Sequence, residues 1–140
     1  MIHKQPVLPG VVEYISSAEN FGLKIGLASS SPREWVIGHL SRVNLISRFS
    51  AICGAEDVQE VKPDPSLYQC AIKKLGIQGS RAIAIEDSHH GVMAAKAAGL
   101  FCVAVPNEIT RQMDFSNADM ILEELTQIPL REIIRRFDGK

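Results

Sequence analysis

The feature that most constrains this chain is the alternation of short apolar runs with helical patterns. Almost continuously apolar runs of this length are typical of strands buried on both faces of a sheet. The runs are residues 24–29, 50–55, 82–87 and 101–106, with 118–122 as a weaker fifth. Strands that alternate with helices pack as parallel strands joined by right-handed crossovers. The pattern predicts an α/β protein with a doubly wound parallel sheet, and residues 1–140 are expected to form one domain.

Helical segments between the runs carry recognisable start and stop residues. Ser31 and Glu34 have the spacing of a capping box, with Pro32 at the first helical position. Asp64 is expected to cap the following helix. Gly76 is expected to end that helix, because glycine adopts the left-handed conformation that terminates helices.

The two ends of the chain are also predicted to be helical. The segment 8–22 has a helical pattern where a strand would normally open such a fold, so a first strand of the sheet is expected to be missing. The segment 123–137 is amphipathic, and Pro129 is expected to break or kink it.

Composition excludes several functional classes. Hydrophobic residues make up 46% of the chain, charged residues 22%, and the net charge is −1, as in ordinary soluble globular proteins. No basic block indicates nucleic-acid binding, and no run approaches the roughly 20 apolar residues that a membrane span needs. No secretory signal is recognisable, so a cytoplasmic location is expected. The three cysteines show no C-x-x-C spacing and are interpreted as small apolar core residues in a reducing compartment.

Polar residues gather where the predicted strands end. Serines 29–31 follow the first run, Glu86 and Asp87 end the third, and Lys62 precedes the helix that leads to the third run. In a parallel sheet, ligands bind at the carboxyl ends of the strands. A hydroxyl group and helix amides suit phosphate oxygens, a lysine offsets their charge, and carboxylates hold a hard cation such as Mg²⁺. The sequence therefore predicts a phosphate and metal site.

Structural roles remain open for several of these residues. Asp87 or Ser88 could merely cap the next helix, and Lys62 could be an ordinary surface lysine. The predicted helix cap accounts for a serine at position 31. Ser29 is therefore the better candidate for binding phosphate. His89 and His90 are interpreted as exposed residues of a first helical turn that could touch a substrate, since no other spaced ligands accompany them.

The motifs "GLKIGLASSSPREWV", "KPDPSLY" and "IEDSHHGVMAAKAAG" resemble three motifs of the haloacid dehalogenase (HAD) superfamily, in the family's order. The chain is most similar to its β-phosphoglucomutase-like phosphatases, which have a Rossmann-like core. The resemblance implies that Ser29, with Ser30 beside it, binds the phosphoryl group and that Lys62 bridges phosphate and nucleophile. It implies further that Asp87 binds Mg²⁺, and that Glu86 is the second acid, ligating it directly or through water.

One motif of that family is absent. Its nucleophile is the first aspartate of a D-x-D motif, whereas the aspartates here are residues 57, 64, 87, 114, 119 and 138. The segment that would carry a helical cap is absent too. The resemblance places the missing strand between those bearing Ser29 and Asp87, so unpaired strand edges are expected.

These observations predict a Mg²⁺-dependent phosphatase that acts on a small phosphorylated metabolite when the full-length parent is intact. The 140 residues alone are expected to be inactive. Two alternatives remain open: a sugar phosphomutase, and a non-catalytic fragment or binding module that pairs with another chain through its strand edges. The substrate and the oligomeric state are not predicted.

Overall fold

All five predicted strands are present in the computed structural model, which describes residues 10–139. Each strand is shorter than the apolar run that contains it. They are β1 (Gly26–Ala28), β2 (Ala51–Cys53), β3 (Ile83–Glu86), β4 (Phe101–Ala104) and β5 (Met120–Ile121). Every observed pairing between them is parallel, which confirms the predicted α/β architecture.

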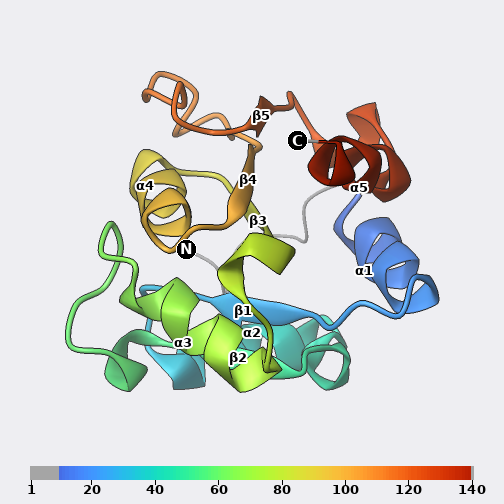
Figure 1. Cartoon of the computed structure of the whole chain (residues 1–140). Coiled ribbons are helices and arrows are strands. Elements are labelled where there is room, and N and C mark those ends of the chain that lie inside the picture. The colour runs from blue at the N-terminus through green and yellow to red at the C-terminus, as the bar shows by residue number, and fades with distance from the viewer. Residues whose placement is uncertain (1–9, 140) are drawn as a thin grey trace.

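Five α-helices alternate with or flank these strands (Figure 1). They are α1 (Val11–Asn20), α2 (Arg33–Arg42), α3 (Ser66–Leu75), α4 (His89–Ala97) and α5 (Leu130–Asp138). Pro129 separates α5 from a short 3-10 turn at Leu125–Gln127, so the predicted break is confirmed. The first described element is helix α1, in agreement with the helical opening.

The capping box predicted for α2 is wrong. Pro32 occupies the N-cap position, and no side chain of the helix itself caps it. The carboxylate of Glu56, from a distant segment, instead accepts a hydrogen bond from the Arg33 amide at 2.7 Å. Asp64 does accept from the Ser66 amide, at 2.9 Å, but from one position before the N-cap.

The strands form two sheets rather than one. One sheet has the order β1-β2 and the other has the order β3-β4-β5. Within residues 10–139, β1 and β3 are therefore strands with one unpaired edge each. This arrangement confirms the expected unpaired edges, because the parallel strands are divided between two sheets.

Helices cover both faces of the larger sheet. Val103 and Met120 pack with Tyr14 of α1 and Ile133 of α5 on one face. On the other face the alternating residues of β3 and β4 pack against α4 and the Tyr68 ring of α3. The smaller sheet lies between α2 and α3, and α1 contributes to the cores of both sheets (Figure 1). Short apolar strands sandwiched between helices are the doubly wound arrangement.

The cysteines are free thiols, as expected. Cys53 and Cys70 lie close together, with their sulfur atoms 2.9 Å apart, although seventeen positions separate them. Burial, then the hydrogen bond with Cys70, raises the pKa of Cys53 to about 12. Burial and the charge of Glu86 raise the pKa of Cys102 to about 12. Within the described residues, no helix is long and apolar enough to cross a membrane.

These thiols should differ in reactivity. Iodoacetamide attacks the thiolate, so at pH 8 the partly exposed Cys70 should be alkylated while fully buried Cys53 and Cys102 resist. Peptide mass spectrometry of the labelled native protein measures the three sites separately. In guanidinium chloride all three should be labelled, and equal labelling of Cys53 and Cys70 in the native state would contradict this packing.

Candidate functional site

The site is organised around the ammonium group of Lys62, which joins the two sheets. Its Nζ donates to the carbonyl oxygen of Ala28, the last residue of β1, at 2.9 Å. The same Nζ lies 2.5 Å from Oε2 of Glu86, the last residue of β3. The carboxyl ends of β1 and β3 thus meet at one cation. Parallel strands present their carboxyl ends on one edge, which explains why distant residues converge here.

Glu86 is a buried carboxylate with two partners. Its side chain is 6% exposed, and Tyr68 donates its hydroxyl hydrogen to the Oε2 atom that also contacts Lys62. Burial, followed by the charge of Glu86, raises the pKa of Tyr68, so the phenol stays protonated and serves as a donor. Lys62 Nζ also lies 5.0 Å from the centre of the Tyr68 ring. A buried carboxylate is tolerated when it is paired and hydrogen-bonded in this way.

The Glu86 carboxylate sits against the first turn of α4. A Cβ atom on Gly91 would lie only 1.7 Å from Oε1 of Glu86 and 2.1 Å from its carboxylate carbon. Ser88 caps the helix, because its Oγ accepts a hydrogen bond from the Gly91 amide at 3.0 Å. The positive end of the helix dipole favours a carboxylate at this place. Gly91 is therefore the residue that allows Glu86 to approach the helix.

The serines differ in their positions. Ser29 is buried and directly follows the Ala28 carbonyl that Lys62 contacts, so Ser29, Lys62 and Glu86 share one end of the fold. The Ser29 Oγ accepts a hydrogen bond from the Ser31 amide at 3.1 Å. Ser30 is exposed.

Asp87 is the exposed acid of the pair. Asn107, in the loop after β4, donates its Nδ2 hydrogen to Oδ2 of Asp87 at 3.2 Å. The Oδ1 atom of Asn107 is held by the Thr110 amide at 2.9 Å, which fixes the amide group. Asp87 does not cap α4, since Ser88 does. Its carboxylate remains accessible to a ligand at the strand end.

Glu86 and Asp87 are the two carboxylates that could serve as ligands for a cation at this site. Within residues 10–139, no three His, Cys, Asp or Glu side chains group closely enough to form a metal cluster. Mg²⁺ commonly takes only one or two carboxylates and keeps waters or phosphate oxygens as its remaining ligands. Asp87 fits that role, whereas Oε2 of Glu86 is already occupied by Lys62 and Tyr68.

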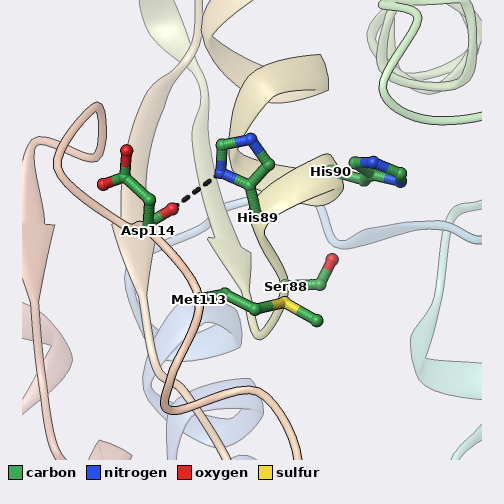
Figure 2. Close-up of a pocket in the computed structure, with 5 residues that line it drawn as sticks. All are labelled: Ser88, His89, His90, Met113 and Asp114. Atoms are coloured by element: carbon green, nitrogen blue, oxygen red, sulfur yellow. Dashed lines mark hydrogen bonds between the residues drawn. The ribbon is translucent and has the colours of Figure 1, made fainter.

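A shallow cavity of about 380 Å³ adjoins this end of the fold. Figure 2 shows its lining: Ser88, both histidines, Met113 and Asp114. His89 Nδ1 lies 2.7 Å from the Asp114 carbonyl oxygen, while His90 is exposed. Both histidines lie in the first turn of α4, as predicted.

Sequence reasoning missed Tyr68, Gly91 and Asn107. Tyr68 had a readable signal, because a tyrosine on a buried helix face needs a hydrogen-bond partner for its hydroxyl. Gly91 had one too, since a glycine inside a helical pattern often marks a close approach. Asn107 lies in a loop whose path is set by tertiary packing, and no local pattern indicated its contact with Asp87.

The fold and the site define an α/β protein whose polar groups gather at the carboxyl ends of parallel strands. The family model described as Haloacid dehalogenase-like hydrolase matches residues 2–105, and the chain belongs to this family. It is 48% identical to YhcW of Bacillus subtilis over 132 residues, which are 94% of this chain and 60% of YhcW. It is 34% identical to hexitol phosphatase B of Escherichia coli K12, covering 93% of this chain and 59% of that protein.

Solved structures show the same architecture. CbbY from Rhodobacter sphaeroides, solved in complex with phosphate, has a TM-score of 0.82 and 31% identity, covering 86% of this chain and 55% of CbbY. A beta-phosphoglucomutase from Clostridium difficile has a TM-score of 0.83 at 24% identity, covering 95% and 57% of the two chains, and shows the shared fold. The chain thus spans between about half and three fifths of the length of these relatives.

The packing of Glu86 against Gly91 can be tested by substitution. Gly91→Ala should lower the free energy of unfolding by about 1–3 kcal/mol, because the added methyl group must displace a buried, paired carboxylate. Urea denaturation followed by circular dichroism measures the change.

Gly38→Ala is the matched control for this substitution. It is also a helical glycine, and its nearest neighbour would be the end of the Arg42 side chain at 3.7 Å. This variant should be neutral, or more stable by up to about 1 kcal/mol, because alanine is the better helix former. Equal effects of the two substitutions would show that Glu86 does not pack as described.

Proposed function

We propose that this chain forms the phosphate-binding and cation-binding part of a Mg²⁺-dependent phosphatase that acts on a small phosphorylated metabolite. The observation that carries the proposal is the convergence of Ser29, Lys62 and the two acids at the carboxyl ends of β1 and β3. Membership of a hydrolase family supports the reaction class. The relatives include a hexitol phosphatase and a CbbY structure that contains phosphate, which supports the substrate class.

Lys62 and Ser29 would bind the phosphoryl oxygens. The Lys62 side chain is 13% exposed, and Glu86 and the Ala28 carbonyl fix the position of its ammonium group. A fixed cation stabilises an anion better than a mobile one, because no side-chain freedom is lost on binding. The Ser29 hydroxyl, already oriented as an acceptor by the Ser31 amide, is free to donate its hydrogen to a phosphate oxygen.

Asp87 would hold Mg²⁺ directly, and Glu86 would act through water. This division follows from the contacts, since Asp87 is exposed and Glu86 is buried between Lys62 and Tyr68. Bound Mg²⁺ would neutralise the charge that builds up on a transferring phosphoryl group. Asn107 would orient the Asp87 carboxylate through its side-chain amide.

The 140 residues should bind ligands without turning them over. Family members that use this chemistry attack phosphorus with an aspartate from a D-x-D motif, and the sequence contains none. Purified chain with Mg²⁺ should therefore not hydrolyse para-nitrophenyl phosphate. Turnover that survives purification and disappears in Asp87→Ala would contradict this.

Binding itself gives a test that does not depend on turnover. Mg²⁺ is titrated in the presence of inorganic phosphate while amide NMR shifts are recorded. The amide shifts of residues at the carboxyl ends of β1 and β3 should change. Asp87→Asn removes one charge at constant shape and should weaken Mg²⁺ binding at least about tenfold.

Asp138→Asn is the control for Asp87→Asn, because Asp138 is also exposed but lies at the end of α5. It should leave Mg²⁺ binding unchanged. If Asp87→Asn binds Mg²⁺ as tightly as the control does, the cation site lies elsewhere.

A further inference from the structure

Two cysteines from different elements lie in contact, one at each end of the segment that carries Lys62. Cys53 is the last residue of β2, Cys70 lies in α3, and their sulfur atoms are 2.9 Å apart. The sulfur atoms of a disulfide are about 2.05 Å apart, so the two atoms need to approach by only about 0.9 Å. The fold therefore already brings these thiols together in the arrangement that a bond between them requires.

The packing around the two sulfur atoms treats them unequally. Cys53 is fully buried and forms a core cluster with Leu67 and Ala71 of α3, and Cys70 packs against this cluster from its edge. Cys70 is partly exposed. A small solute can therefore reach the sulfur of Cys70, whereas the sulfur of Cys53 is reached through Cys70.

The electrostatic surroundings also distinguish the two thiols. Burial, followed by the hydrogen bond with Cys70, raises the pKa of Cys53 to about 12, so this thiol keeps its proton at neutral pH. Lys74 lies one turn along α3 from Cys70, and its Nζ donates to the carbonyl oxygen of Ile52 at 3.3 Å. A positive charge beside a thiol favours attack by its thiolate. Cys70 is thus placed to react first and Cys53 to react second.

The segment between the cysteines belongs to the candidate site. Residues 54–69 include Lys62, whose ammonium group contacts the Ala28 carbonyl and the Glu86 carboxylate. A bond between Cys53 and Cys70 would join the two ends of this segment. A cross-link restricts the freedom of the chain that it encloses. The state of the two thiols would therefore act on the segment that positions the Lys62 ammonium group.

We propose that Cys70 and Cys53 form a peroxide-reactive pair, in which hydrogen peroxide converts the two thiols into a disulfide that restrains the segment carrying Lys62. The Cys70 thiolate attacks a peroxide oxygen; a sulfur–oxygen bond forms, the oxygen–oxygen bond breaks, and hydroxide leaves and takes up a proton. The Cys53 sulfur then attacks the Cys70 sulfur, and the sulfenic oxygen leaves as water with the Cys53 proton. The thiols lose two electrons, and the peroxide is reduced to water.

The pair is also expected to be reversible, because a thiol reductant such as dithiothreitol opens a disulfide by exchange. The inference does not rest on the phosphatase proposal, since it concerns the thiols and the segment between them.

Oxidation of the native chain tests the bond. The reduced 140-residue chain is treated with a small excess of hydrogen peroxide, and the remaining thiols are blocked with N-ethylmaleimide in guanidinium chloride. Peptide mass spectrometry should find Cys53 linked to Cys70 and the blocking group on Cys102, which lies in a different core cluster. In chain unfolded before oxidation, pairings with Cys102 should appear as well, because the cost of loop closure rises only slowly with length.

Single substitutions separate the two steps. Cys53→Ala should leave a sulfenic acid on Cys70 that dimedone traps, whereas Cys70→Ala should leave Cys53 as an unreacted thiol. Cys102→Ala is the matched control, because Cys102 is also fully buried but belongs to another cluster. It should form the Cys53–Cys70 bond as the unsubstituted chain does, and circular dichroism checks that each variant is folded.

Hydrogen exchange followed by mass spectrometry measures the restraint. Oxidation should slow amide exchange in residues 55–69 at least about threefold relative to the amides of α5. The proposal is overturned if native chain pairs Cys102 as often as it joins Cys53 to Cys70, or if peroxide leaves all three thiols unreacted. It is overturned equally if sulfenic acid accumulates on Cys70 of the unsubstituted chain, or if the bond forms without slowing exchange in that segment.

Discussion

The arrangement of this protein depends on the contact between Lys62 and Glu86. Lys62 comes from the loop before α3, which packs on the smaller sheet, whereas Glu86 ends a strand of the larger sheet. Because both groups are largely buried, removing one charge would leave the other unpaired, at a cost of about 3–5 kcal/mol. The pair therefore fixes how the two sheets meet, and it fixes the position of the Lys62 ammonium group at the carboxyl ends of β1 and β3.

The environment of Glu86 shows how one carboxylate is accommodated inside the fold. Lys62 supplies the opposite charge, Tyr68 supplies a hydrogen bond, and the first turn of α4 contributes its dipole. Gly91 leaves the space that this arrangement needs. Each partner comes from a different element, so a change in the packing of α3 or α4 alters the site directly.

Much of the secondary structure could be predicted from the sequence, because local patterns determine which segments form strands and which form helices. Apolar runs identified the five strands within residues 10–139. Gly76 adopts the predicted left-handed conformation at the end of α3, with φ of 72°. The cap of α2 could not be predicted, because it depends on Glu56, which is adjacent only after folding. The partnership of Glu86 with Tyr68 and the orientation of Asp87 by Asn107 were missed for the same reason.

The candidate site lies at the place where the two sheets meet. Ser29 follows β1, Glu86 ends β3 and Asp87 follows Glu86. Lys62 contacts the last residue of each of these strands, so the groups proposed to bind phosphate and a cation lie where the two sheets meet. Ligands in parallel sheets bind at such strand ends. A change that shifts one sheet relative to the other would therefore alter the candidate site directly.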